Sequence, residues 1–173
     1  MPSKMYLKLG DIQGDCKDKG HEDQIGVSVW SWGMSRPAVF SAQGGATDGM
    51  PNMQDLAVSK WIDASSPRIM EACCKGEHID KAVLEVWTEP EAKGKKKKAS
   101  KEKARRPYGL RIIMENVIVT TISTASGEND SVFTETIYLN FARFAYEYLG
   151  ESDKGPGSRR SQLRWDVVKN STF

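Results

Sequence analysis

One alternating stretch runs Val132-Phe-Thr-Glu-Thr-Ile-Tyr-Leu-Asn-Phe-Ala-Arg-Phe-Ala-Tyr-Glu-Tyr-Leu149 and is far longer than a typical strand of about 5–6 residues. Its large apolar residues occupy odd positions at first (Ile137, Leu139, Phe141) and even positions afterwards (Phe144, Tyr146, Tyr148). Because successive side chains of a strand point to opposite faces, this change of parity exchanges the buried face. The pattern predicts a bent strand that leaves one sheet and joins another, as in a barrel.

Shorter strand-like segments lie on both sides of this stretch. In the segment from Ile25 to Trp32 the apolar parity also changes, which indicates a bulge or a corner. In Leu56–Trp61, the residues Leu56, Val58 and Lys60 share one face. The other candidate strands are Tyr6–Leu9, Ala82–Trp87, Leu110–Met114, Val117–Ile122 and Leu163–Val168. We therefore expect a mainly β fold: a small β-barrel of two antiparallel sheets.

One segment carries the start and stop signals of a helix. Ser66 suits the N-cap, Pro67 suits the first helical position, and Gly76 suits the position after the last turn. The residues expected on the packing face are Ile69, Met70 and Cys73. The sequence predicts one short α-helix over about residues 66–76.

The segment Gly33–Asn52 is rich in glycine, serine and methionine and shows no clear periodicity. Its turn signals are Gly44-Gly45 and Asp48-Gly49-Met50-Pro51. A loop of this length is uncommon inside a compact domain unless it has a function. We therefore expect a functional loop here.

Length and composition limit the class of protein. A chain of 173 residues with 39% hydrophobic residues suits one globular domain, 1–173. No apolar run approaches the roughly 20 residues that span a bilayer, and the first residues lack the apolar region of a signal peptide. The three cysteines do not form a disulfide framework, which favours synthesis in a reducing cytosol.

The charge is unevenly distributed. Residues 93–106 contain nine basic residues and one acid and carry +8, whereas the rest of the chain carries −6. We interpret about 89–107 as a Lys-rich surface insertion, either a solvated loop or a contact for an acidic partner. Its candidate contact residues are Lys95, Lys96, Lys97, Lys98, Arg105 and Arg106. No aromatic residue lies among them to stack on bases, so nucleic acid is not the expected partner.

Signals for catalysis and metal binding are weak. The chain has no G-x-S-x-G motif, no P-loop and no dinucleotide-binding fingerprint. Cys73, Cys74 and His78 are near one another in sequence, but adjacent helical residues point about 100° apart and do not readily share one ion. We expect no enzyme activity, no cofactor and no metal.

The order and spacing of several motifs identify a family. These motifs are Tyr6-Leu-Lys-Leu-Gly-Asp-Ile-Gln-Gly, Val29-Trp-Ser-Trp-Gly-Met-Ser, Ser66-Pro67, Ile118-Val-Thr-Thr-Ile-Ser-Thr, Glu135-Thr-Ile-Tyr-Leu-Asn-Phe-Ala and Trp165-Asp-Val-Val-Lys-Asn. Through them the chain resembles the Hcp (haemolysin-coregulated protein) family of type VI secretion over about residues 5–88 and 108–170.

The resemblance implies a phage tail-tube-like barrel with one helix, six subunits to a ring, and rings stacked into a tube that carries effector proteins in its lumen. It implies a structural protein whose partners are itself, spike and sheath components and effectors, without membrane insertion. It also implies synthesis in the bacterial cytoplasm and secretion without a signal peptide. The extended loop is expected to touch neighbouring subunits and the next ring. Its candidate contact residues are Phe40, Gly44, Gly45, Asp48 and Met50.

The segment from Glu89 to Pro107 departs from the family, whose members have a shorter and less basic connection here. Long surface insertions add little closure entropy, so the fold is expected to tolerate it. This departure leaves a second interpretation open: a secreted binding or adaptor module whose Lys-rich loop engages an acidic partner.

Overall fold

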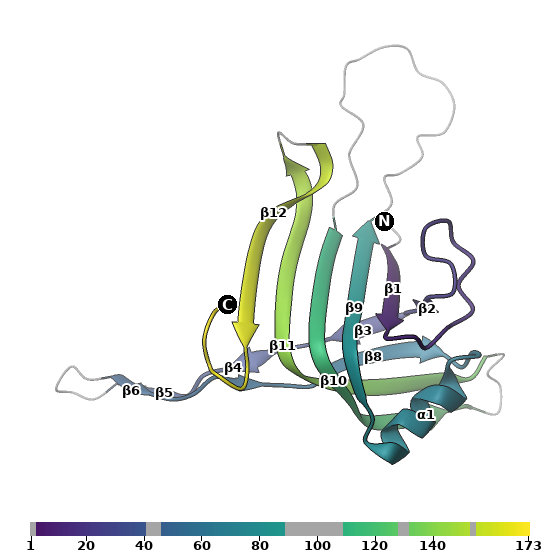
Figure 1. The fold of residues 1–173 in the computed structure, drawn as a ribbon, viewed down its shortest axis with the longest axis horizontal. Coiled ribbons are helices and arrows are strands. Elements are labelled where there is room, and N and C mark those ends of the chain that lie inside the picture. Colours follow the sequence, from purple (N-terminus) through teal and green to yellow (C-terminus); the bar gives the residue numbers. More distant parts are fainter. Residues whose placement is uncertain (1–2, 41–45, 89–108, 128–131, 153–154) are drawn as a thin grey trace, which may run out of the picture.

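The structure, a computed structural model, describes residues 3–40, 46–88, 109–127, 132–152 and 155–173 (Figure 1). The predicted Lys-rich insertion, including Lys95–Lys98, Arg105 and Arg106, lies outside these residues. The elements are β1 (Ser3–Leu9), β2 (Ile25–Gly26), β3 (Val29–Ser31), β4 (Met34–Ser35), β5 (Ala38–Phe40), β6 (Ala46–Asp48), β7 (Asn52–Met53), β8 (Leu56–Trp61), α1 (Ser66–Lys75), β9 (His78–Thr88), β10 (Gly109–Ala125), β11 (Thr134–Ser152) and β12 (Gly155–Asp166).

Eight of these strands form one antiparallel sheet in the order β2-β1-β9-β10-β11-β8-β3, with β12 also paired to β11. The long strand β11 changes partner along its length. Thr134–Leu139 pairs with β8, whereas β12 pairs with β11 from Arg143 onward. The strand changes partners as predicted, but the two sets of partners belong to one continuous sheet and not to two separate sheets.

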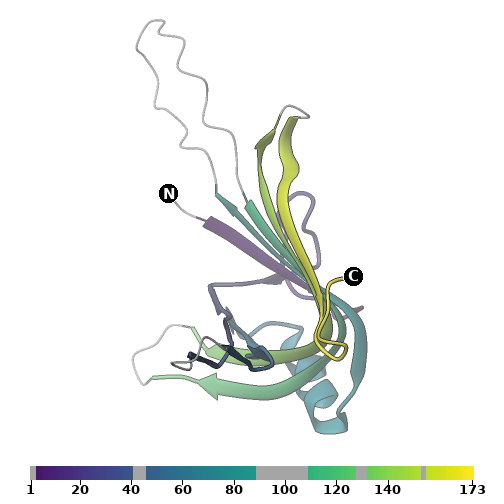
Figure 2. The same ribbon diagram turned by 90° about the vertical axis from the view of Figure 1, so that its left-hand side faces the viewer.

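The sheet bends sharply along a crease that crosses its three central strands. Figure 2 shows β10 and β11 turning from an upright half into a lower half. On each strand, two buried residues three positions apart face the same core, so the inward parity changes within every strand. The pairs are Ile79 and Ala82 on β9, Met114 and Val117 on β10, and Phe141 and Phe144 on β11.

These pairs are in register across the sheet. Met114 lies opposite Phe144 and Ala82, and Val117 lies opposite Phe141 and Ile79. Between Met114 and Val117, Asn116 adopts a positive φ of 54°, a conformation that asparagine tolerates better than most residues. The two predicted segments Leu110–Met114 and Val117–Ile122 are thus one strand with a kink.

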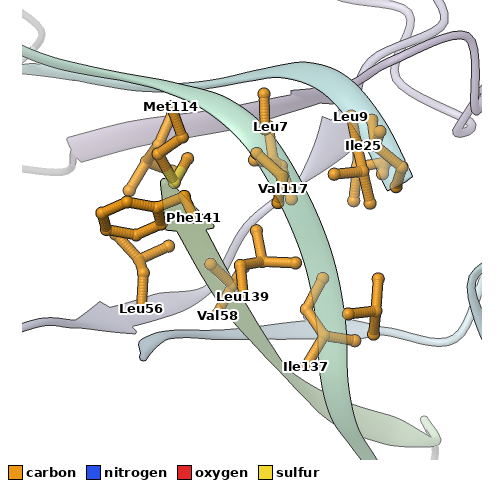
Figure 3. Close-up of a cluster of buried hydrophobic side chains, with 14 of the residues drawn as sticks. Leu7, Leu9, Ile25, Leu56, Val58, Met114, Val117, Ile137, Leu139 and Phe141 are labelled. Carbon is orange, nitrogen blue, oxygen red and sulfur yellow. The ribbon is translucent and has the colours of Figure 1, made fainter. Parts of the chain in front are cut away.

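The core fills the inside of the bend. Figure 3 shows side chains of both halves meeting there, with Leu7 and Met114 from the upright half and Val58 and Ile137 from the lower half. Trp32 covers the crease and contacts the rings of Phe141, Phe144 and Tyr146 at centroid distances of 5.7, 4.8 and 6.3 Å. The bend brings the inner faces of the two halves together, and the core forms between them.

The predicted corner in Ile25–Trp32 links the two ends of the sheet. Val27 N–H donates to Met5 on β1, and the next residue, Ser28, donates through its N–H to Ser59 on β8. The chain therefore leaves one edge of the sheet and joins the other within two residues. This corner does not extend the ladder into a fully closed barrel, but the mainly β fold with one helix is as predicted.

The N-cap of helix α1 lies one residue earlier than predicted, and the helix packs against the sheet through a different set of residues. Ser65, not Ser66, occupies the N-cap, and Gly76 ends the helix with a left-handed φ of 60° as expected. Its buried residues are Ser66, Ile69 and Ala72. The expectation that Met70 packs was wrong, because this i, i+3, i+6 stripe turns Met70 toward solvent.

Tyr148 was also wrongly predicted to be buried. Phe144 is buried and Tyr146 is partly buried, but the side chain of Tyr148 is 40% exposed. At this level β11 and β12 rise past the packed core (Figure 1), and the ladder between them shifts register after Tyr148. Leu149, the next residue, is only 2% exposed, so at this level it is the side of β11 that carries Tyr148 that lacks cover.

The crease predicts a strong contrast between two aromatic residues of β11. Phe144→Ala should lower the free energy of unfolding by about 3–5 kcal/mol, because it leaves a cavity beneath Trp32. Tyr148→Ala, on the same strand, should lower it by about 1 kcal/mol or less. Equilibrium denaturation measures both values, and equal losses would show that the crease contact does not hold the core.

Candidate functional site

The lower half of the sheet has an uncharged outer face. On the side opposite the core, two in-register rows cross strands β3, β8, β11 and β10, and a third crosses β8, β11 and β10. Their members are Val29–Ser59–Thr136–Ser123, Ser31–Ala57–Tyr138–Thr121 and Trp61–Thr134–Ala125. Every described member is exposed or partly exposed, and none is charged. The face therefore presents hydroxyl, methyl and aromatic groups to whatever lies against it.

The hydroxyl groups of this face are partly satisfied within the sheet. Ser59 Oγ lies 2.9 Å from Thr136 Oγ1. At the margin of the face, Asp55 accepts hydrogen bonds from Thr120 Oγ1 at 2.5 Å and Asn140 Nδ2 at 2.7 Å. This acid is thereby held at the bulge between Val119 and Thr121 and keeps the start of β8 in place.

The same half of the sheet has two open edges. The ladder between β9 and β10 ends at the pair His78–Ile118, so no described strand pairs with that edge of Thr120–Ala125. At the other end of the order, β3 has no strand partner beyond β8 in the described chain. Unpaired edges expose backbone donors and acceptors and are the usual place for another chain to pair.

The segment Gly33–Asn52, expected to be a loop, contains two short ladders. Met34 and Ser35 pair with Met53 and Asn52, and β5 pairs with β6 further out. Figure 1 shows that this ribbon, which we call the hairpin (residues 33–54), prolongs the β3–β8 pair and projects beyond the sheet. At Gly49 a Cβ would lie 2.5 Å from the carbonyl oxygen of Pro37, so the two strands approach too closely for another residue.

The predicted contact residues of this segment lie on the hairpin. Phe40 and Asp48 belong to β5 and β6, and Met50 is 70% exposed. Gly44 and Gly45 lie outside the described residues. Because the hairpin exposes Met34 and Met50, it is suited to pack against another surface.

A buried ion pair lies on the core side of this half of the sheet. Lys60 Nζ is 2.6 Å from Glu135 Oε1 and 2.8 Å from Asp63 Oδ1, and Lys60 is 0% exposed. Ser66 Oγ, at the start of α1, donates to the same Glu135 oxygen at 2.7 Å. Glu135 Oε2 has no hydrogen-bond partner in the described chain. The network joins β8, β11 and α1. It agrees with the sequence prediction that Lys60 lies on the same face of its strand as the buried Leu56 and Val58.

Asp63 connects this network to the helix. Burial raises the pKa of Asp63, but hydrogen bonds from Lys60 and Ser65 outweigh burial and hold that pKa below its usual value. Ser65 N–H donates to Asp63 Oδ1 at 2.9 Å, so the carboxylate orders the turn that precedes α1. The charged form of Asp63 therefore stabilises the start of the helix.

The arrangement suits assembly better than catalysis. Among the described residues, no group of three or more His, Cys, Asp and Glu side chains could hold a metal ion. In that same part of the chain, no helix is long and apolar enough to cross a membrane. The chemically notable features are the neutral face, its open edges and the projecting hairpin. The fold and this surface define a mainly β protein whose bent sheet leaves two strand edges without a strand partner in the described chain.

Comparisons with known proteins identify its family. Residues 6–148 match the family model "Type VI secretion system effector, Hcp". The chain is 36% identical over 175 residues to protein hcp1 of Pseudomonas aeruginosa, covering 98% of each chain. A solved type six secretion system protein superposes with a TM-score of 0.80 at 22% identity, covering 99% of this chain and 100% of that one. Hcp1 from Salmonella typhimurium gives 0.68 at 21% identity, with full coverage of both chains.

The chain therefore belongs to the Hcp family of type VI secretion system effectors. The neutral face and its open edges were not predicted from the sequence. The available signal was the hydroxyl residues at alternate positions, Thr121 and Ser123 on one strand and Thr134 and Thr136 on its neighbour.

The buried pair predicts unequal effects of single and double substitutions. Lys60→Met should lower the free energy of unfolding by about 3–5 kcal/mol, because it leaves Glu135 buried without its cation. The double variant Lys60→Met, Glu135→Leu should recover most of that loss. Denaturant unfolding of the three proteins measures this, and a double variant no more stable than the single one would contradict it.

The lowered pKa of Asp63 predicts that the folded protein loses some of its stability in acid. Because its pKa is lowered in the folded state, its contribution is complete above its unfolded pKa of about 3.9 and is lost as the pH falls below that value. Asp63→Asn should therefore make unfolding less dependent on pH in this range than it is for the unmodified protein. Thermal unfolding at pH values from 6 down to 2.5 measures the difference, and parallel curves would refute the assignment.

Proposed function

We propose that the chain is the structural subunit of a type VI secretion tube, in which subunits close into hexameric rings and the rings stack. The observation that carries this proposal is the neutral four-stranded face with an open edge on each side. An edge of Thr120–Ala125 and the edge of β3 are different surfaces, so their pairing joins one copy to the next head to tail. Such heterologous contacts form a closed ring when the rotation closes. The number six comes from the family resemblance.

The neutral face is the surface that we assign to the lumen. Pairing along the open edges would continue the face of β3, β8, β11 and β10 from one subunit to the next and leave the apolar core on the other side of the sheet. A lining of hydroxyl, methyl and aromatic groups offers no strong fixed charge to hold a passing protein. It therefore suits the carriage of effector proteins that must later be released.

The hairpin is assigned to contacts between neighbouring subunits and between rings. It prolongs β3 and β8 beyond the sheet and exposes Met34 and Met50, so it reaches past the subunit that carries it. Spike and sheath components are the further partners. We propose that the protein is made in the cytoplasm and leaves as part of the propelled tube, with no bond made or broken by its own residues.

Ring formation tests the tube proposal. Negative-stain electron microscopy of the purified protein should show six-fold rings with a central hole. Particles that remain monomeric at high protein concentration would contradict the proposal.

The hairpin gives a second test, with the fold as its control. Replacing residues 41–45 by Asn-Gly would join Phe40 to Ala46 through a two-residue turn of the kind that closes hairpins. The variant should stack poorly into tubes, measured by sedimentation and microscopy, while its thermal unfolding midpoint stays close to that of the unmodified protein. An equal loss of thermal stability would show instead that the hairpin belongs to the core structure.

A further inference from the structure

A small basic pocket lies on the upright half of the sheet, on the side opposite the core. Its volume is about 290 Å³. The lining residues are Lys8, Gln24, Lys81, Val83, Glu85, Arg111 and Ile113. This pocket is separate from the neutral face, the open edges and the hairpin. At the small end of the range for ligand pockets, it has room for one or two side chains more readily than for a large small molecule.

Two lysines of the pocket have no acidic partner in the described chain. Lys8 lies opposite Val83, which places it diagonally across from both Lys81 and Glu85 on the same face, at a typical separation of about 7–8 Å. The acid opposite Lys81 is Glu115, whose carboxylate lies 3.5 Å from Arg143. Neither ammonium group has an ion pair or hydrogen bond with another described residue. Water screens the repulsion between these two exposed ammonium groups, and an anion that lies between them is attracted by both.

The third cation is fixed in place by acids of the sheet. Arg111 Nε donates to Glu85 Oε1 at 2.7 Å, and its Nη1 lies 3.8 Å from Glu147 Oε2. Glu85 also lies 3.6 Å from His21 Nδ1. Because Glu85 is engaged by Arg111, it does not neutralise the two lysines. The positive charge available to a ligand is therefore that of Lys8 and Lys81.

The floor of the pocket is apolar. Val83 and Ile113 face each other across β9 and β10, and both are partly exposed. A carboxylate carried on an aliphatic stem matches this combination, because the stem covers the floor while the charge reaches the ammonium groups. A free inorganic anion would use the lysines but leave the floor exposed to water.

We propose that this pocket binds an acidic side chain of a partner protein, presented on a glutamate- or aspartate-containing peptide segment. The contact lies on a different surface from the proposed lumen and does not depend on ring formation. It is also distinct from the Lys-rich segment 93–106, whose charge is larger but which contributes no residue to the pocket.

A site-resolved titration tests the proposal on the full chain. Hexaglutamate peptide is added to protein labelled at isoleucine δ1-methyl groups, and the Ile113 signal is followed by NMR. This readout separates the pocket from any binding by the Lys-rich segment. The Ile113 signal should shift and saturate, while that of Ile69, which is buried under α1, should stay in place.

Two double variants with the same loss of charge complete the test. Lys8→Gln, Lys81→Gln should weaken the affinity reported by Ile113 by about tenfold, as expected from the loss of two exposed charge contacts. Lys17→Gln, Lys19→Gln, on the exposed loop before Gln24, should change it by less than about twofold. All four lysines are exposed, so both variants should fold.

Three results would overturn the proposal. The first is an Ile113 signal that does not move with hexaglutamate. The second is an equal loss of affinity in the two double variants, which would indicate only long-range attraction. The third is an equal response to inorganic phosphate at matched charge, which would reassign the pocket to small anions.

Discussion

The crease across β9, β10 and β11 is the constraint on which the rest of the structure depends. A sheet whose strands kept one parity throughout would bury one flat face and would need a second layer to cover it. Here each central strand changes its inward parity along a single line, and the pairs Met114–Phe144 and Val117–Phe141 keep the changes in register. The sheet can therefore fold onto itself, with Trp32 over the bend.

The bend also separates the chemistry of the two halves. Below the crease, β9 no longer accompanies β10, which leaves the edge of Thr120–Ala125 without a strand partner in the described chain. The core side of that half holds the Lys60–Glu135 pair and the start of α1, and the three rows of its outer face carry no charge. Above the crease, the outer side carries the ladder of Glu85, Arg111 and Glu147. A half with open edges and a half with a ladder of charged residues thus follow from one deformation.

The sequence predicted the bend because parity is a local property: the change from Phe141 to Phe144 is visible in the order of residues. The helix boundaries were also readable, from Pro67 and Gly76. The exposure of Met70 and Tyr148 was not, because it depends on where the core ends in three dimensions. Nor could the sequence show that Gly33–Asn52 pairs as a ribbon, since its alternation is short and interrupted by glycine and proline. The neutral face required the register of four strands, which only the structure provides.

The central claim is that the two open edges of the lower half are where copies meet. Hydrogen–deuterium exchange on dilute and on assembled protein tests it directly. The backbone amides of Val29–Ser31 and Thr120–Ala125 should become protected on assembly, while the outer edge of β12 keeps its exchange rate. Unchanged exchange at both edges in protein that has demonstrably assembled would contradict the account.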